Sequence, residues 1–467
     1  MAAAGQHTDS ATSAKGPRLN RSLSLWNLIV IGMVIIQPTA PMGIYGLISN
    51  RAVGHVVTTI LIAMVAMLLT AVSYGKMAAA YPSAGSAYTY VGQETHAALG
   101  YITGWSMVMD YILNPLICIA FCAKATMNIL PGLSYYWWVI IFALFFTWVN
   151  LRGVKTSARI NETLCLGMTI IVVIFLVAVV RFVWNLHNLG AGYFTHPFYN
   201  PATFRPSHIF AGTSVAVLTY IGFDGISTLS EEVENPRRNI LLATVLVCLI
   251  AGLLSSLEVY AAQLVWGDKP FPGGQVESAF AMIARQVGGP ILFQTLNFTL
   301  LVANAGSALG AQLAAGRLLY GMGRGNALPK AFFGSVDAKS RIPRNSMLAV
   351  GGFALIGACV LEYFSTKLGG GAYEIGAQAV NFGAFIAFMG VNAAAFIHYW
   401  LHASKRKLHN FILPTLGFLI CGFIWLNLGK TALILGSVWM LGGILYGAIR
   451  TRGFRTGMVQ FEEPSSN

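Results

Sequence analysis

Apolar segments long enough to cross a lipid bilayer recur along almost the whole chain, and they restrict its fold more than any other feature. A helix needs about 20 consecutive, mostly apolar residues to span the hydrocarbon core. Asp, Glu, Lys and Arg make up 10% of the 467 residues, whereas hydrophobic residues make up 56%. A soluble domain carries about 25% charged residues. The composition therefore excludes a soluble protein and predicts an all-α integral membrane protein.

Twelve segments have the length and hydropathy of transmembrane helices. They are 25–48, 56–77, 98–123, 136–151, 161–183, 209–227, 240–266, 290–313, 346–364, 375–400, 411–428 and 431–449. Residues 1–24 are polar and lack the apolar core of a signal peptide, so they are expected to form a disordered cytoplasmic tail. Residues 450–467 are expected to form a second cytoplasmic tail.

Lys and Arg are distributed unequally between the two sides that these segments define. The termini and the even-numbered loops carry 21 of the 29 cations, and the odd-numbered loops carry 8. Because cytoplasmic loops are enriched in Lys and Arg, both termini are predicted to lie in the cytoplasm, with the protein in the plasma (inner) membrane. The net charge of +13 comes from cations at segment ends rather than from a stripe, which argues against a nucleic-acid partner.

Two of the twelve segments contain residues that interrupt a helix. The first contains Pro38 and Pro41 followed by Gly43, and the sixth contains Asp224 between two glycines. Proline removes a backbone donor and clashes with the preceding turn. The breaks are five segments apart, which is typical of transporters built from two inverted halves that hold the substrate at the broken helices. The alternative interpretation is a pair of kinks with packing roles.

Several motifs resemble the amino acid–polyamine–organocation superfamily. The most specific is 220–238 (YIGFDGISTLSEEVENPRR), which is similar to the sixth-helix signature of that superfamily. Further similar segments are 73–76 (SYGK), 81–90 (YPSAGSAYTY), 104–105 (GW), 110–111 (DY), 150–155 (NLRGVK), 317–324 (RLLYGMGR), 328–329 (LP) and 380–384 (VNFGA). The nearest branch resembles the bacterial putrescine-importer-like permeases.

The resemblance implies a LeuT-type fold with a 5+5 inverted repeat. Residues 25–400 would form a ten-helix core with helices 1 and 6 broken, and 401–449 would form two peripheral helices. The chain departs from the family pattern at three places. Pro38 and Pro41 replace part of the Gly/Ser-rich break in the first helix, whose amides hold the substrate carboxylate in amino-acid-carrying members, and proline has no amide to donate. Gly43 stands where the putrescine-importer-like pattern has an aspartate, and Met168 stands where several proton-coupled relatives have a lysine.

The expected substrate-binding residues lie at the two breaks and on the third segment. They are Pro38, Thr39, Ala40, Gly43, Tyr45, Asp110, Thr219, Ile221, Gly222 and Phe223. Asp110 is interpreted either as a counter-charge for an amine or proton carrier, or as a structural acid. Glu258 is a second proton or coupling candidate, because a buried carboxylate without a cation tends to take up a proton. Asp224 and Gly225 are expected to support the break in helix 6.

Charged and histidine residues near the segment ends have two interpretations each. Glu231, Glu232, Arg237 and Arg238 form either a cytoplasmic gate or an ion-paired helix cap. His398 and His402 have the i, i+4 spacing of metal ligands, but no carboxylate is near them in sequence, so they are expected at the membrane interface. No metal site, cofactor or catalytic residue is predicted.

The predicted function is secondary active transport of amino acids or polyamines by alternating access, coupled to an ion or a proton. An amino acid or amine exchanger is the first alternative, and a channel or membrane-embedded sensor is the second. An enzyme is not predicted, because the chain lacks HExxH, GxSxG and an acidic cluster within a helix pair. The expected partners are a small-molecule substrate, a co-transported proton or cation, and the lipid bilayer.

Overall fold

The computed structural model describes residues 23–82, 85–152, 158–186, 189–230, 233–337, 342–368 and 372–453. Within these ranges the protein is helical, and an isolated parallel β-bridge joins Leu23 to Val233. The elements in chain order are α1 (Leu25–Ile36), α2 (Ala40–Ala52), α3 (Val56–Ala80), α4 (Ser86–Glu94), α5 (Ala97–Ile129), α6 (Tyr135–Leu151), α7 (Ala158–Trp184), α8 (Pro206–Ala216), η1 (Val217–Tyr220), η2 (Phe223–Leu229), α9 (Pro236–Trp266), η3 (Gly273–Ser278), α10 (Ala279–Arg324), α11 (Lys330–Phe333), α12 (Arg344–Leu368), α13 (Ala372–Phe396), η4 (Ile397–Leu401), α14 (Leu408–Leu426) and α15 (Lys430–Arg450).

The described residues contain ten helices that are long and apolar enough to cross a membrane, or eleven when the bent pair α1–α2 counts as one span. The prediction of an all-helical membrane protein is therefore confirmed. Helix α6 lies where the fourth segment was predicted, but its 17 residues make it shorter than the ten. The count of twelve spans stays a prediction, and the two predicted tails lie almost wholly outside the described residues.

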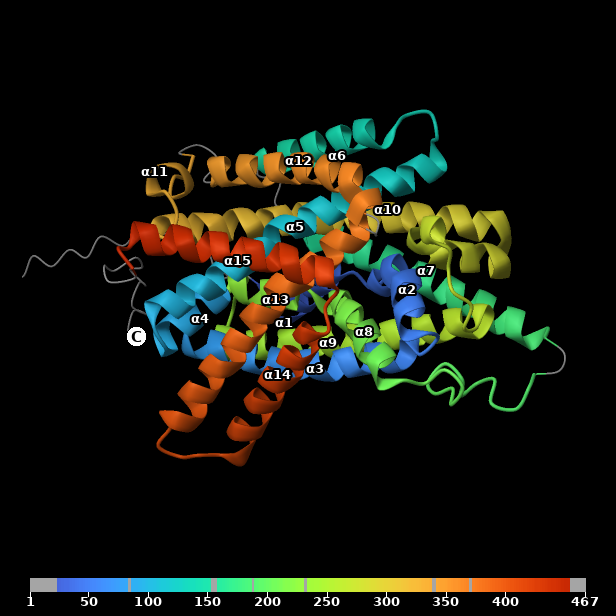
Figure 1. Ribbon diagram of the computed structural model, residues 1–467, viewed down its shortest axis with the longest axis horizontal. Helices are drawn as coiled ribbons and strands as arrows, with labels where there is room; N and C mark the ends of the chain where they lie inside the picture. The colour runs from blue at the N-terminus through green and yellow to red at the C-terminus, as the bar shows by residue number, and fades with distance from the viewer. Residues whose placement is uncertain are drawn as a thin grey trace, which may run out of the picture.

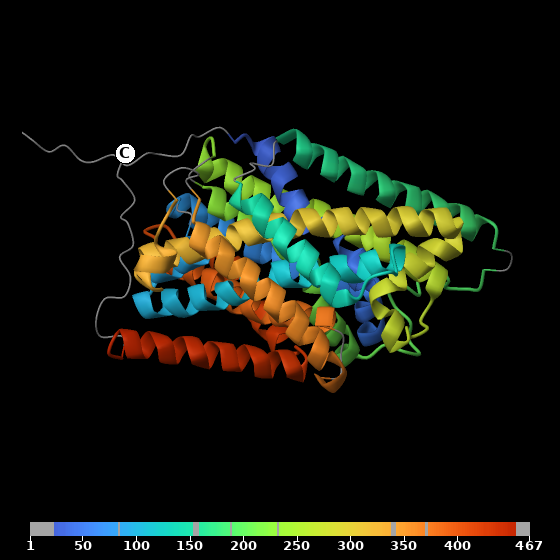
Figure 2. The same cartoon turned by 90° about the horizontal axis from the view of Figure 1, so that it is seen from above.

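The long helices run in similar directions and form one bundle around α5 (Figure 1). Helix α5 packs against α10, α13, α12 and α6, and α3 packs along α9. In the most apolar stretch of α5, 89% of the residues are buried, whereas the corresponding figure for α15 is 22%. Figure 2 shows α15, drawn in red, along one edge of the bundle. The burial therefore separates a central helix from a peripheral one that faces lipid.

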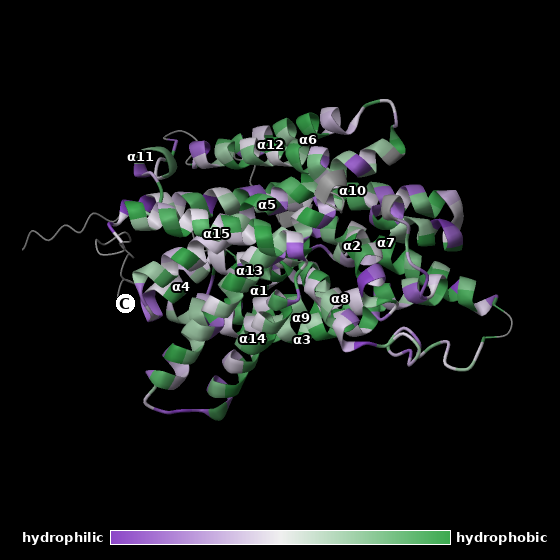
Figure 3. Ribbon diagram, in the orientation of Figure 1, coloured by the Kyte–Doolittle hydropathy of each residue, from purple (hydrophilic) through white to green (hydrophobic). Residues whose placement is uncertain are grey.

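Hydropathy follows the same arrangement. Hydrophobic residues cover the helices along most of their length, and hydrophilic residues gather toward the two ends of the bundle (Figure 3). On α15 the large side chains of Ile434, Val438, Leu441 and Leu445 are exposed along one helical stripe. Exposed apolar side chains of this kind are more stable in contact with lipid than in contact with water.

Two helices depart from regular α geometry. Helix α10 has 46 residues and is kinked at Gly289, whose φ is +69°, just before Pro290. The predicted segment 290–313 begins directly after this kink, and the helix continues beyond it to Arg324. The end of α13 continues into the π-helical turn η4, in which the amide of His402 donates to the carbonyl of Ile397 at 2.9 Å. Such single π turns occur often at functional sites.

Candidate functional site

The first helix break separates α1 from α2. Gln37 follows Ile36 with a positive φ of +70°, and its amide donates to the carbonyl of Met33 at 2.9 Å. Pro38 supplies no amide, and α2 begins at Ala40 with Pro41 in its first turn, where proline is well tolerated. The axes of α1 and α2 differ by 43°. The sequence pattern predicted this break at these residues.

The second break lies between α8 and η2. Regular α-helix ends at Ala216, a short 3-10 segment follows, and Gly222 adopts a φ of +114° before η2 begins at Phe223. The left-handed region favours glycine. A Cβ atom at Gly222 would lie 2.6 Å from Cγ2 of Ile35, so the second break packs directly against the end of α1. The two broken helices, far apart in sequence, meet at this contact.

A small cavity of about 50 Å³ lies where the breaks meet. Its lining comes from the two breaks and from α5, α10 and α13, and it consists of Ile35, Ile36, Gln37, Thr39, Ala40, Gly43, Asn114, Ile117, Cys118, Leu218, Ile221, Asn304, Ser307 and Tyr373. One water needs about 10–15 Å³ of such space. The cavity therefore holds a few waters at most, and a larger solute requires the surrounding helices to move apart.

The polar groups around this cavity are neutral. The hydroxyl of Thr39 is buried and has no hydrogen-bond partner among the described residues. The amide group of Asn304 donates to the carbonyl of Leu300 at 2.9 Å, which leaves its oxygen free to accept, and Ser307 donates to the carbonyl of Ile35 at 3.3 Å. The lining thus offers donors and acceptors without a formal charge.

The predicted substrate-binding residues divide into two groups. Thr39, Ala40, Gly43 and Ile221 line the cavity. The remainder, which do not line it, are Pro38, Tyr45, Asp110, Thr219, Gly222 and Phe223.

Sequence reasoning missed Asn114, Asn304, Ser307 and Tyr373, which do line the cavity. Polar residues inside apolar segments were the available signal for these positions. That signal is shared by many polar residues that only satisfy their own helix.

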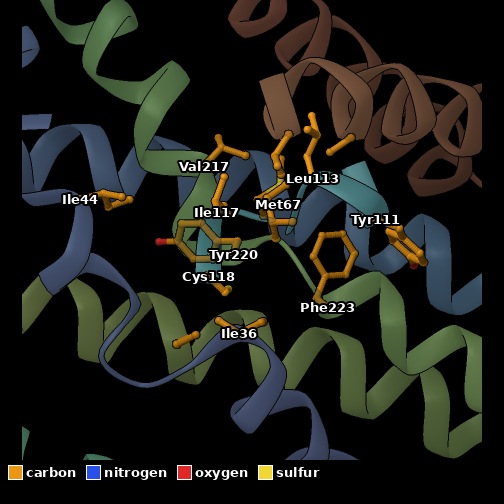
Figure 4. Packing of buried hydrophobic residues seen from close by; sticks show 14 of the residues in the cluster. Ile36, Ile44, Met67, Tyr111, Leu113, Ile117, Cys118, Val217, Tyr220 and Phe223 are labelled. Atoms are coloured by element: carbon orange, nitrogen blue, oxygen red, sulfur yellow. The ribbon is translucent and has the colours of Figure 1, made fainter. Parts of the chain in front are cut away.

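Aromatic side chains that follow each break in the chain are packed against other rings. Tyr45 packs edge-on against Phe271 and Phe280, and its hydroxyl donates to Gln263 at 3.3 Å. After the second break, Phe223 packs against Tyr74 and Phe388, with ring centroids 5.5 and 5.3 Å away. Figure 4 shows the ring of Phe223 with Tyr220 to one side and Tyr111 to the other. Each break is therefore followed by a buried, packed group of aromatic rings.

The two intramembrane aspartates, Asp110 and Asp224, are buried and do not line the cavity. The Tyr111 hydroxyl donates to Oδ2 of Asp224 at 2.7 Å. No hydrogen bond reaches Oδ1 of Asp224 from the described residues. Oδ1 of Asp110 has no hydrogen-bond partner among the described residues. The support of the break by Asp224 and Gly225 stays a prediction.

Glu258 on α9 is completely buried and does not line the cavity. Neither of its carboxylate oxygens has a hydrogen-bond partner among the described residues. Met168 on α7 packs with Val34 of α1 and Ala303 of α10, so apolar groups fill the position where proton-coupled relatives have a lysine. The environment of Glu258 leaves its predicted coupling role open.

The predicted cytoplasmic gate is only partly described. Glu231 and Glu232 lie outside the described residues. Arg237 and Arg238 are in the first turn of α9, and no salt bridge to a described carboxylate is formed there.

A cluster of one glutamate and two histidines that sequence reasoning missed lies at the end of α4. The buried carboxylate of Glu94 contacts Nδ1 of His398 at 2.5 Å and Nδ1 of His402 at 3.5 Å. Tyr81 donates to the same carboxylate, and burial, together with this hydrogen bond, raises the pKa of Tyr81. The two histidines therefore do have a carboxylate neighbour. Among the described residues, this is not a metal-binding group of three or more ligands.

Two sets of ion pairs lie near the end of α5 and between the end of α2 and the start of α13. Lys124 on α5 contacts Glu277 at 3.6 Å and Glu362 at 3.1 Å. Arg51 at the end of α2 contacts Glu374 of α13 at 3.0 Å.

Known proteins resemble this chain over nearly its full length. The profile of the family described as "Amino acid permease" matches residues 23–446. The low-affinity putrescine importer PlaP of Escherichia coli (strain K12) is 31% identical over 95% of this chain and 97% of that protein. The branched-chain amino acid permease BcaP of Lactococcus lactis is 24% identical over 91% and 93% of the two chains.

A solved structure shares the fold. The crystal structure of a mutant manganese transporter from Eremococcus coleocola superposes with a TM-score of 0.50. The alignment covers 91% of each chain at 13% sequence identity. At that identity the likeness concerns the arrangement of helices alone.

Proposed function

Because the chain belongs to the amino acid permease family, we propose that it carries an amino acid or a polyamine across the plasma (inner) membrane by alternating access. The family is one of transporters rather than enzymes, as the sequence predicted. In this mechanism the two broken helices bind the solute and one part of the bundle rocks against the other. The solute is thereby exposed first to one side of the membrane and then to the other.

The observation that carries the proposal is the meeting of both helix breaks at one polar cavity. Gly222 packs against Ile35, and Thr39 and Ile221 line the space between the breaks. Irregular backbone at membrane depth is tolerated where it lines a cavity or is buried in protein. Packed aromatic rings lie next to both breaks in the chain, with Tyr45 against Phe280 and Phe223 against Tyr74.

The finer architecture belongs to the same proposal. The ten helices from α1–α2 to α13, with α6 counted as a span, would form the LeuT-type 5+5 inverted repeat, and α14 and α15 would be peripheral. The excess of Lys and Arg on one side would place both termini in the cytoplasm. Glu231, Glu232, Arg237 and Arg238 would then lie at the cytoplasmic end, where ion pairs that break and re-form can act as a gate.

The substrate class follows from the relatives and from the lining of the cavity. The relatives include a protein named as a putrescine importer and another named as a branched-chain amino acid permease. Neutral donors and acceptors on Thr39, Asn114 and Asn304 suit the hydrogen-bonding groups of either solute. Asp110, one helical turn before Asn114 on α5, is the nearest proposed counter-charge for an amine. Asp110 and Glu258 are the proposed proton or coupling sites.

The test is uptake into liposomes that contain the purified protein. Labelled putrescine and labelled alanine are supplied separately, with and without an inward proton gradient, and counterflow against internal unlabelled solute is measured in parallel. Saturable uptake or counterflow of at least one solute is expected. Stimulation by the gradient would support proton coupling, whereas counterflow without net uptake would support an exchanger. Absence of saturable uptake and of counterflow for both solutes would overturn the proposed substrate class.

A further inference from the structure

Four buried polar side chains gather next to the cavity without lining it. They are Tyr74 of α3, Asp110 and Tyr111 of α5, and Asp224 of η2, and they are called here the carboxylate–tyrosine cluster. Tyr74 is 0% exposed, and the two aspartates are each 1% exposed. The Tyr111 hydroxyl lies 2.7 Å from Oδ2 of Asp224, and Asp110 directly precedes Tyr111 on α5. Tyr74 packs against Phe223, the residue before Asp224, with ring centroids 5.5 Å apart, so three separate elements bring these side chains together.

The hydrogen bonds within the cluster are incomplete. Tyr111 donates to Asp224, but Oδ1 of Asp110 and the hydroxyl of Tyr74 have no hydrogen-bond partner among the described residues. A buried polar group without a partner costs about 1–3 kcal/mol. Such groups are rare in folded proteins and call for an explanation, such as a bound ion. Tyr74 is independent evidence for a ligand, because its unpaired hydroxyl is not part of the acidic pair.

The cluster also lacks a cation. Among the described residues, neither Asp110 nor Asp224 forms a salt bridge with Lys, Arg or His. Two carboxylates that share a buried site cannot both be ionised cheaply unless a positive charge joins them. The chemistry of the cluster therefore fits a ligand with one positive charge and hydrogen-bond donors.

The position of the cluster relative to the cavity indicates how a ligand would reach it. Asp110 precedes Asn114, a cavity-lining residue, by one turn of α5, or about 6 Å along the helix. Asp224 follows Ile221, which also lines the cavity, by three residues. In Figure 4 the ring of Phe223 lies between Tyr220 and Tyr111. The same ring packs against Tyr74. Aromatic faces of this kind attract cations when water is excluded.

We propose that the carboxylate–tyrosine cluster binds the ammonium group of an amine substrate whose remaining part occupies the central cavity. Asp110 and Asp224 share the positive charge, and the oxygen of Tyr74 accepts one of the ammonium protons. The side chain of Phe223 moves aside to connect the two spaces. The assignment rests on the proposed function, because it names the substrate as an organic amine. A monovalent coupling cation carries the same charge as an ammonium group. The experiment therefore has to distinguish binding of an amine from binding of such a cation.

The experiment measures binding to purified protein in nanodiscs, which does not depend on transport. Putrescine and n-butylamine are titrated by calorimetry in choline chloride at neutral pH, and melting temperatures are recorded in choline, sodium and potassium chloride. Both amines are expected to bind the wild type. Asp110→Asn and Asp224→Asn are expected to raise the Kd for both amines at least tenfold, and Tyr74→Phe is expected to raise it severalfold.

Matched controls carry the same substitutions away from the cluster. Asp268→Asn removes a carboxylate that pairs with Asn200 and Gln263, and Tyr101→Phe removes a hydroxyl that donates to Gly443. Both are expected to keep the wild-type Kd. The Asn variants remove charge from an uncompensated pair, so without ligand they are expected to melt at or above the wild-type temperature. A folding defect is thereby separated from a loss of binding.

Three results would overturn the assignment. The first is an unchanged Kd in both Asn variants. The second is stabilisation by sodium or potassium, lost in those variants, without any effect of the amines, which would make the cluster a coupling-ion site. The third is that neither amine binds the wild type. Failure of the proposed function is distinct, because it appears as absent uptake in liposomes even where amine binding and its loss in the variants are observed.

Discussion

The carboxylate of Glu94 lies 2.5 Å from Nδ1 of His398, although 304 positions separate the two residues in the sequence. This contact joins α4, a short helix outside the long spans, to the π-helical end of α13. His402 approaches the other oxygen of the same carboxylate at 3.5 Å. The cluster therefore ties the position of α4 to that of α13.

Replacing His398 with alanine should destabilise the protein. The side chain of Glu94 is only 3% exposed, so the variant leaves a buried carboxylate without one of its hydrogen-bond partners, while the Tyr81 hydroxyl remains. Because His398 is itself 32% exposed, water offsets part of the loss, and a decrease of about 1–3 kcal/mol in the free energy of unfolding is expected. Thermal unfolding in detergent checks this. His402→Ala should have a smaller effect, and His409→Ala, at an exposed position, should have almost none. Equal melting temperatures for all three would contradict the role of the contact.

Gly222→Ala should impair both folding and uptake. The φ of +114° disfavours any residue with a Cβ, and that atom would lie 2.6 Å from the side chain of Ile35. Strain at such a position costs about 1–3 kcal/mol. The control is Gly442→Ala, because a Cβ there meets no atom within 4 Å and alanine favours a helix. Uptake and melting temperature are measured for both variants. Wild-type uptake by Gly222→Ala would show that the two breaks need not touch.

Gly43→Asp should favour a diamine over a neutral amino acid. Gly43 lines the cavity, and a Cβ there would lie 3.4 Å from the hydroxyl of Tyr373 and 3.5 Å from Phe121, which is ordinary contact. The new carboxylate supplies a counter-charge that the cavity lining lacks. The ratio of kcat/KM for putrescine to that for alanine is expected to rise about tenfold, equivalent to about 1.4 kcal/mol. Gly43→Asn has the same shape without the charge and should leave the ratio near its wild-type value. The same rise in both variants would assign the effect to volume.

Ser307→Ala should weaken substrate binding while leaving the fold intact. The Ser307 hydroxyl donates to the carbonyl of Ile35 in the first break, and it lines the cavity. A neutral hydrogen bond contributes about 0.5–1.5 kcal/mol, so KM should rise about two- to tenfold. Ser256→Ala is the matched control, because its hydroxyl donates only to Gly252 within its own helix. An unchanged KM in Ser307→Ala would separate this bond from substrate binding.

Local chemistry explains why most of the helices and both breaks could be predicted. Apolar length defines a span, and proline or glycine interrupts it through effects on neighbouring residues alone. Pro38 and Gly222 accordingly lie at the breaks where the sequence placed them. The exception is α6, whose 17 residues are too few to decide from length whether the helix crosses the membrane.

The composition of the site could be predicted only in part, because side chains converge through packing between distant elements. Tyr45 lies next to the first break in sequence, yet helical rotation turns it toward Phe280 and away from the cavity. Asn304 reaches the cavity from α10, and nothing in its local sequence distinguishes it from Asn297, which donates to its own helix. The carboxylate partner of His398 could not be predicted from the local sequence either, because Glu94 lies on α4, 304 positions earlier in the chain.

The π turn at Ile397–Leu401 changes the direction in which side chains point around the helix axis after the end of α13. A π turn holds one more residue than an α turn, which rotates the chain beyond it by about 100° relative to a regular helix. The first part of α13 can therefore face α5 while His398 and His402 face Glu94. Deleting one residue from this turn would restore a regular helix and carry His402 away from its partner. The extra residue thus fixes the angle between the side of α13 that contacts α5 and the side that carries His398 and His402. A rotation of α13 about its own axis would break one of these two sets of contacts.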